Sequence, residues 1–228
     1  IYSLQYMKKI IWISSYPKSG NTFLRAMLSA FFYSEDGIFK QDYLKNIAEF
    51  PRDFFELKPS NNFLNEIEEY ETIQKKISNT NKKIIFLKTH LANITVNKTI
   101  PTINKDYSMC AIYIVRDPRN VITSLKNHYE LSYSEAFDFI TNERRYIYDQ
   151  HKIDDFSDFQ FIGSWKTNFQ SWNYQKEIPM KLVKYENLLS DTYSTSLEII
   201  QFVDKIMKNN EGIDKKKLEN AINSTSFE

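Results

Sequence analysis

Four short apolar segments constrain the fold of this chain more than any other feature of its sequence. They span residues 10–14, 84–88, 110–115 and 181–185. Each is rich in β-branched or aromatic residues and is bounded by polar or turn residues, which is typical of a buried β-strand. Strands of this mainly apolar character indicate a parallel sheet that is covered on both faces.

Helical patterns lie between these segments. Apolar side chains recur at helical spacing at Phe23, Leu24, Met27, Leu28 and Phe31 after the first segment, and at Val121, Ile122, Leu125 and Tyr129 after the third. Alternating strands and helices predict an α/β fold, a single domain over residues 1–228 with a central parallel β-sheet flanked by helices. The aromatic-rich stretches 40–82 and 129–160 are interpreted as helical excursions from that sheet.

Composition excludes several classes of protein. Lysine and arginine total 30 against 29 acidic residues, so the chain lacks the basic excess of a non-specific nucleic-acid binder and any bound anion needs a local site. No apolar run approaches the roughly 18 residues of a membrane span. Cys110 is the single cysteine, so an intrachain disulfide is ruled out and a cytoplasmic location is favoured. We expect Cys110 to be buried and to pack as a small apolar residue. Residues 1–6 precede Met7, a candidate natural start, and are left out of the fold prediction.

The first predicted strand leads directly into the sequence Ser-Tyr-Pro-Lys-Ser-Gly-Asn-Thr, residues 15–22, which we call the anion loop. A loop from a strand to a helix N-terminus points unpaired N–H groups at one place, where the helix dipole also favours negative charge. Gly20 allows close approach to a ligand, Ser19 and Thr22 offer hydroxyls, and Lys18 adds a full charge. The plainer alternative is a helix start capped by Ser or Asn.

This loop differs from the phosphate loop of ATPases, G-x-x-x-x-G-K-[ST], because Lys18 precedes Gly20 and no Lys-Ser/Thr pair follows. The Ser or Thr hydroxyl that binds Mg²⁺ in the ATPase loop is therefore missing from its usual position after the lysine. We expect a phosphate-type group to bind here without a divalent cation, and no spacing of Cys, His and carboxylate residues predicts a metal site.

A second anion site is predicted at the end of the third strand. Asp117 and Pro118 are a good helix start, which explains those two residues but not Arg116 before them. An arginine at the carboxyl end of a strand, with Ser124 two turns into the following helix, suits a second phosphate.

The second strand ends in Lys88-Thr89-His90, so both Lys88 and His90 reach the same edge of the sheet as the two anion sites. A neutral imidazole there can accept a proton from an attacking hydroxyl. A lone histidine is more often a satisfied polar residue, and only the convergence with the two loops favours catalysis. His128 and His151 show no such setting in the sequence.

Five motifs in order resemble the cytosolic sulfotransferases that use 3′-phosphoadenosine 5′-phosphosulfate. The motifs are residues 16–23, 88–90, 116–119 with Ser124, 163–165 and 184–186. The resemblance covers about residues 8–228 and implies the P-loop-like fold of that family. It is dense in the motifs and weak in the two aromatic-rich stretches.

The resemblance implies a role for each matching residue. Lys18, Ser19, Gly20, Asn21 and Thr22 would hold the 5′-phosphosulfate, Phe23 would stack on adenine with Tyr185 nearby, and Arg116 and Ser124 would bind the 3′-phosphate. His90 would be the catalytic base, with Lys18 and Lys88 stabilising charge on the transferring group. The acceptor would be a hydroxyl or amine of a small molecule, lipid or saccharide, which the sequence does not identify.

The chain departs from the family pattern at two residues, and this sequence ends before a third feature of the family, a glycine-rich segment. Phe23 replaces a more usual tryptophan, and Asn21 replaces a common threonine. In the family a glycine-rich segment that closes over the nucleotide follows a Ser-Phe-Glu, and this sequence stops at that point, at residues 226–228. If that lid is absent, donor binding is expected to be weak.

Two other functions remain open at this stage. One is an Mg²⁺-dependent nucleotide kinase, which the order of Lys18 and Gly20 disfavours. The other is a phosphonucleotide-binding module without activity, since fold does not establish catalysis. The aromatics Trp165, Phe169 and Trp172, at i, i+4 and i+7, are predicted to pack in the core.

Overall fold

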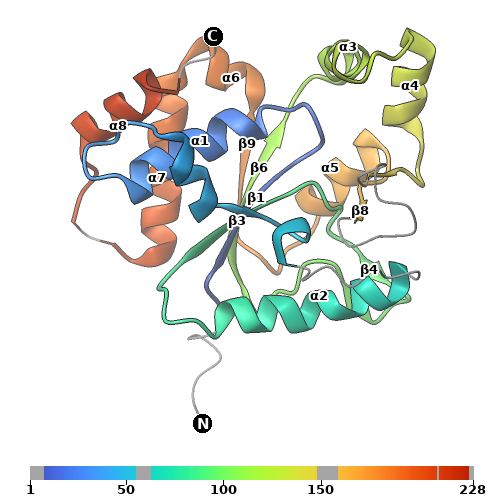
Figure 1. Cartoon of the computed structure of the whole chain (residues 1–228), viewed down its shortest axis with the longest axis horizontal. Helices are drawn as coiled ribbons and strands as arrows, with labels where there is room; N and C mark the ends of the chain where they lie inside the picture. The colour runs from blue at the N-terminus through green and yellow to red at the C-terminus, as the bar shows by residue number, and fades with distance from the viewer. Residues whose placement is uncertain (1–7, 55–62, 148–158, 210, 226–228) are drawn as a thin grey trace.

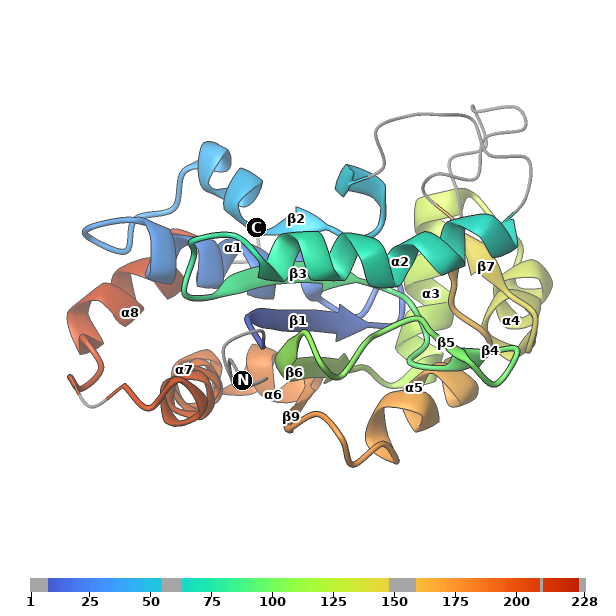
Figure 2. The same ribbon diagram turned by 90° about the horizontal axis from the view of Figure 1, so that it is seen from below.

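A five-stranded parallel sheet forms the centre of the protein in the computed structural model, which describes residues 8–54, 63–147, 159–209 and 211–225. The strands follow the order β2-β3-β1-β6-β9, and Figure 2 shows this order from one edge of the sheet to the other. Their bounds are Ala48–Glu49 (β2), Ile85–Thr89 (β3), Ile10–Ser15 (β1), Ser108–Val115 (β6) and Met180–Lys184 (β9). Because every strand runs the same way, their carboxyl ends meet at one edge of the sheet.

Helices cover both faces of this sheet (Figure 1). The described α-helices are α1 (Asn21–Tyr33), α2 (Phe63–Ser78), α3 (Pro118–Tyr129), α4 (Tyr133–Thr141), α5 (Trp165–Asn173), α6 (Tyr185–Ser190), α7 (Thr192–Met207) and α8 (Lys215–Asn223). Short 3₁₀ turns occur at η2 (Gln41–Asn46) and η3 (Arg52–Phe54). Two-residue antiparallel pairs join β4 (Thr95–Val96) to β5 (Ile100–Pro101) and β7 (Tyr146–Ile147) to β8 (Gln160–Phe161).

Each face of the sheet has its own apolar core. Ile11 and Ile13 of β1 pack with α1, α7 and α8, whereas Ile10 and Trp12 point to the opposite face and pack with α2 and α5. The alternation follows from the two-residue period of a strand. A third, smaller cluster joins α3 and α4 around the buried ring of Tyr16, beside the carboxyl edge of the sheet.

The predicted α/β architecture is confirmed, and the four predicted strands differ from β1, β3, β6 and β9 by no more than two residues at either end. The predicted helices lie within α1 and α3. Trp172 is fully buried, Trp165 and Phe169 are partly buried against the cores, and Cys110 is fully buried as expected. Burial raises the pKa of its thiol to about 12.

The stretch 40–82 is not wholly helical, because it contains the edge strand β2. Two residues are too few to produce a recognisable strand pattern, and this pairing is long-range. Among the described residues, no helix combines the length and apolar character needed to cross a membrane.

Candidate active site

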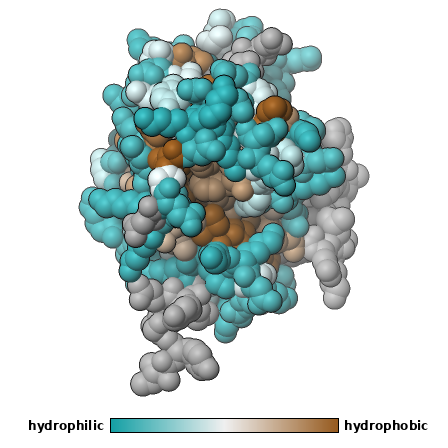
Figure 3. All heavy atoms as spheres, turned by 90° about the vertical axis from the view of Figure 1, so that its left-hand side faces the viewer, coloured by the Kyte–Doolittle hydropathy of each residue, from teal (hydrophilic) through white to brown (hydrophobic). Residues whose placement is uncertain are grey.

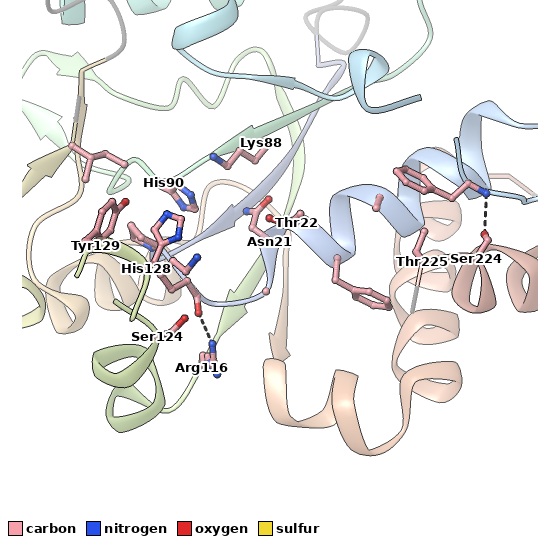
Figure 4. A pocket seen from close by; sticks show the side chains of 17 residues that line it. Asn21, Thr22, Lys88, His90, Arg116, Ser124, His128, Tyr129, Ser224 and Thr225 are labelled. Atoms are coloured by element: carbon pink, nitrogen blue, oxygen red, sulfur yellow. Dashed lines mark hydrogen bonds between the residues drawn. The ribbon is translucent and has the colours of Figure 1, made fainter. Parts of the chain in front are cut away.

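A cavity of about 650 Å³ lies at the carboxyl edge of the sheet, where the ends of β1, β3 and β6 meet (Figure 4). The residues that line it are Pro17, Lys18, Gly20, Asn21, Thr22, Phe23, Ala26, Phe39, Lys88, His90, Arg116, Ser124, His128, Tyr129, Ile147, Ser224 and Thr225. All but two of the predicted site residues are in this set, and the exceptions are Ser19 and Tyr185. Parallel strands explain this convergence, because ligands bind at the carboxyl ends of open α/β sheets.

The anion loop has a strained backbone. Lys18 has φ +64° and Gly20 has φ +95°, both in the left-handed region. Gly20 is the N-cap of α1, and no side chain caps that helix, so the plainer explanation of a Ser or Asn cap does not hold. A Cβ added to Gly20 would lie 2.4 Å from Cδ2 of Tyr185, so only glycine fits this position without displacing the tyrosine ring.

Two donors at the loop are buried without a hydrogen-bond partner among the described residues. They are the Ser19 hydroxyl and Nε of Arg116. Nη1 of Arg116 donates to the carbonyl of Lys18 at 2.8 Å, and its guanidinium lies 4.4 Å from the centre of the Tyr185 ring. Burial and then the charge of Arg116 lower the pKa of Lys18. Unpaired donors and neighbouring cations are the features that an anionic group needs.

Asn21 turns its side-chain amide nitrogen back toward the sheet. Nδ2 donates to the Ile13 carbonyl and to the Ser15 hydroxyl, each at 3.2 Å. Its Oδ1 is buried and has no partner among the described residues. The amide therefore ties the start of α1 to the end of β1.

His90 follows β3, and the geometry defines which of its nitrogens carries hydrogen. Nδ1 lies 2.7 Å from the carbonyl oxygen of Ser15, and a carbonyl can only accept. Nδ1 is therefore the donor, which leaves the lone pair of the neutral ring on Nε2. Burial and then the nearby Lys88 lower the pKa of His90 well below its usual range, against opposing effects of Ser15 and Glu49.

Lys88 is held in an ion pair that the sequence did not predict. Its Nζ lies 2.6 Å from Oε1 of Glu49 on β2, and both side chains are largely buried. Glu49 pairs directly with Lys88 in the β2–β3 register. Burial lowers the pKa of Lys88, and the charge and hydrogen bond of Glu49 oppose that shift.

The start of α3 confirms the predicted cap. The Asp117 side chain accepts from the backbone N–H of Arg119, and Pro118 occupies the first helical turn. Glu186 accepts from the backbone N–H of Asp117 at 2.9 Å. These contacts place Arg116 and Ser124 on the same side of the cavity (Figure 4).

One end of the cavity is lined by Phe23, Phe39, Ser224 and Thr225. The Ser224 hydroxyl accepts from the backbone N–H of Phe39 at 2.9 Å and ties the segment after α1 to the end of α8. Figure 3, which views the side where α1 and α8 lie, shows an apolar hollow bordered by polar atoms. Ser224 and Thr225 were not predicted, because only the tertiary fold brings the end of α8 to the cavity. Residues 226–228, after which the family's lid segment was expected, lie outside the described residues.

His128 and Tyr129 lie at the opposite end (Figure 4), and together with Ile147, which also lines the cavity, we call them the outer wall. The expectation that His128 has no place in the site was wrong. It lies one turn beyond Ser124 on α3 and thus on the same side of that helix. Ring contacts join His128 to Tyr129, and Tyr129 stacks on Phe139. His151 lies outside the described residues.

Tyr185 lies beside the loop rather than in the cavity lining, since its ring packs on Gly20 and under Arg116. No cluster of three or more potential His, Cys, Asp or Glu metal ligands occurs in the described part of the chain. No acidic residue lines the cavity there either, so its charged lining is entirely basic.

The model of the sulfotransferase domain family matches residues 8–228. The chain belongs to this family. Luciferin sulfotransferase of Photinus pyralis is 24% identical over 225 residues, which cover 96% of this chain and 55% of that protein. The chain thus spans about half the length of the curated relative that it matches.

Solved structures show the same fold. A structure of retinol dehydratase with androsterone and the inactive cofactor PAP has a TM-score of 0.56 and 14% identity, covering 95% of this chain and 64% of that one. A second, with retinol and PAP, has a TM-score of 0.53 and 14% identity, covering 92% of this chain and 62% of that one. At this identity the likeness establishes the sulfotransferase fold.

Proposed function

We propose that this protein transfers a sulfuryl group from 3′-phosphoadenosine 5′-phosphosulfate to a hydroxyl or amine of a small acceptor. The observation that carries the proposal is one cavity in which the free Nε2 of a neutral His90 meets Lys18 and Arg116, with no acidic residue in the described lining. Such a site attracts a polyanion and also offers a base. Membership of the sulfotransferase family supports the same reaction.

The donor supplies an activated sulfuryl group, and the chain supplies its binding site. The N–H groups of the anion loop, the Ser19 and Thr22 hydroxyls and Lys18 would hold the 5′-phosphosulfate, because they lie at the N-terminus of α1, where no side chain caps the helix and the Ser19 hydroxyl is without a partner among the described residues. Arg116 and Ser124 would hold the 3′-phosphate, and Phe23 would stack on adenine. Tyr185 would support this end by fixing Gly20 and Arg116.

His90 would accept the proton of the acceptor. As the new bond from acceptor oxygen to sulfur forms and the bond from sulfur to the phosphate oxygen breaks, the proton passes to Nε2. The Ser15 carbonyl orients the ring through Nδ1. Lys18 and Lys88 would stabilise the charge on the transferring group and its leaving oxygen, which in reactions of this type supplies most of the rate enhancement.

The acceptor is proposed to be a small molecule, a lipid or a saccharide that enters past the outer wall. The structural neighbours carry androsterone or retinol together with PAP, which supports a small hydroxyl compound as acceptor and PAP, 3′,5′-adenosine bisphosphate, as product. We propose that the protein works in the reducing cytoplasm, since its single cysteine is buried as a thiol.

A thermal-shift and transfer experiment separates the three candidate functions. We expect 3′,5′-adenosine bisphosphate to raise the melting temperature in the presence of EDTA, because a ligand that binds only the folded state stabilises it. Stabilisation by ATP with Mg²⁺ alone would favour a kinase instead. Incubation with ³⁵S-labelled donor and a panel of phenols, sterols, amines and saccharides should then label an acceptor, and binding without any transfer would favour a module without activity.

A further inference from the structure

Glu49 is a buried carboxylate that the proposed reaction does not use directly. It does not line the cavity, but it contacts Lys88, which does, and two further side chains. Oε1 lies 2.6 Å from Nζ of Lys88 and 3.3 Å from Nε2 of Gln160, and Oε2 lies 3.2 Å from Nη2 of Arg52. A carboxylate with this many charged and polar partners is stabilised in spite of its burial.

A chain of two hydrogen bonds through Gln160 connects Glu49 to the main chain of His90. Because Nε2 of Gln160 donates to Glu49, its Oε1 faces the other way and accepts from the backbone N–H of His90 at 2.8 Å. The hydroxyl of Thr89 also donates to this Oε1, at 3.4 Å. One carboxylate thus anchors the Lys88 side chain and, through one amide, the main chain of His90.

The charges around Lys88 show why this anchor is needed. Arg52 on η3 and Arg25 on α1 place positive charge near Lys88, and the neutral ring of His90 lies on the β3 side. Among the described residues, the negative charge that acts on Lys88 comes from Glu49. Burial together with the charges of Arg52 and Arg25 lowers the pKa of Lys88, and the charge and hydrogen bond of Glu49 raise it. Without the carboxylate, Lys88 would lose its proton at a lower pH.

We propose that Glu49 is a positioning residue for sulfuryl transfer, which holds Lys88 as an ammonium at the cavity and fixes the main chain of His90 through Gln160. This inference rests on the proposed function. In this proposal the two-residue strand β2 places the carboxylate of Glu49 next to Lys88 at the carboxyl edge of the sheet.

The first test follows the proton of Lys88 and needs neither donor nor acceptor. Pulse labelling of lysines with acetic anhydride across a pH series, read by mass spectrometry, gives the midpoint of Lys88 titration. We expect Glu49→Gln to move this midpoint down by about one pH unit or more. The control, Glu198→Gln, removes the partner of the more exposed Lys181 and should leave the Lys88 midpoint unchanged. An unchanged midpoint in Glu49→Gln overturns the proposal.

The second test is a double-mutant cycle in kcat with ³⁵S-labelled donor. We expect Glu49→Gln to lower kcat by about tenfold or more and to move the alkaline limb of the pH profile of kcat to lower pH. In a Lys88→Met background the same change should lower kcat by less than about threefold, since the effects of coupled residues are non-additive. Equal factors in both backgrounds would show that Glu49 acts independently of Lys88 and overturn the proposal.

Two further controls keep the results interpretable. If circular dichroism shows that Glu49→Gln does not fold, Glu49→Asp replaces it, because aspartate keeps the charge on a shorter side chain. The pH midpoint of Lys88 labelling should also fall in Glu49→Asp. If the wild-type protein transfers no sulfuryl group, the proposed function fails, whereas the labelling result separately decides whether Glu49 keeps Lys88 protonated.

Discussion

The sheet edge and the outer wall of the cavity are built in different ways. The sheet edge, with the anion loop, Lys88 and His90, is connected by hydrogen bonds and ion pairs to strands that are buried on both faces. In the outer wall, His128 is exposed and Tyr129 is 46% exposed, and their contacts are mainly between rings. The proposed reactive groups are thus fixed by polar contacts to the sheet, whereas the proposed acceptor side consists mainly of exposed rings. Changes at the sheet edge should therefore affect turnover and donor binding, and changes at the outer wall only acceptor binding.

The largest effect is expected from His90→Ala. Removing the base should lower kcat by about 100-fold or more, while the Kd for 3′,5′-adenosine bisphosphate stays nearly unchanged, because the imidazole acts on the acceptor. Transfer of labelled sulfate and isothermal titration calorimetry measure the two quantities. An unchanged kcat would remove His90 from the mechanism.

Lys18→Ala should affect binding and rate together. A charge-assisted hydrogen bond contributes about 1.5–3 kcal/mol, so we expect donor affinity to fall by roughly 10- to 100-fold and kcat to fall as well. Lys126→Ala, a change of the same charge on α3 outside the cavity lining, serves as the control. Near-normal nucleotide binding by Lys18→Ala would contradict the role of the anion loop.

Gly20→Ala tests the packing of the anion loop against Tyr185. Gly212 is a matched control, because its φ of +77° is also left-handed but an added Cβ there would meet nothing within 4 Å. Backbone strain alone costs about 1 kcal/mol or more, so Gly212→Ala should lose that amount of unfolding free energy and Gly20→Ala about 1–3 kcal/mol more. Urea unfolding measures both, and equal losses would mean that the Tyr185 contact costs nothing.

The smallest effect is expected at the outer wall. Tyr129→Ala should raise the acceptor KM by about threefold and leave donor Kd unchanged, since one partly exposed ring contributes modestly to binding. Tyr174→Ala removes a tyrosine that is 64% exposed and does not line the cavity, and it should change neither constant. A weaker donor Kd in Tyr129→Ala would show that the two regions are not separate.

Much of the sheet edge could be predicted because its information is local. A strand, a turn and a helix start are each encoded within a few neighbouring residues, and parallel pairing then brings the strand ends together without further information. That is why Lys18, His90 and Arg116 were predicted as neighbours and lie in one cavity. Tyr185 was expected near adenine, which stays a prediction, and its packing on Gly20 was not foreseen, because it follows from the start of α6 at that residue.

Long-range pairing accounts for what could not be predicted. Glu49 stands 39 positions before Lys88 in a strand of only two residues, so no periodicity reveals it. Ser224 and Phe39 meet across 185 positions, and His128 enters the site only because α3 runs along the cavity.

Four of the five sheet strands, the helices α1 and α3, the anion loop and the candidate base could be predicted from the sequence alone, because they follow from local apolar periodicity and from residue types with distinct chemistry. Only the tertiary structure decided the partner of Lys88, the hydrogen position on His90 and the composition of the outer wall. These depend on burial and on distances between residues far apart in the chain, which set where a charge is stable and which nitrogen carries a proton.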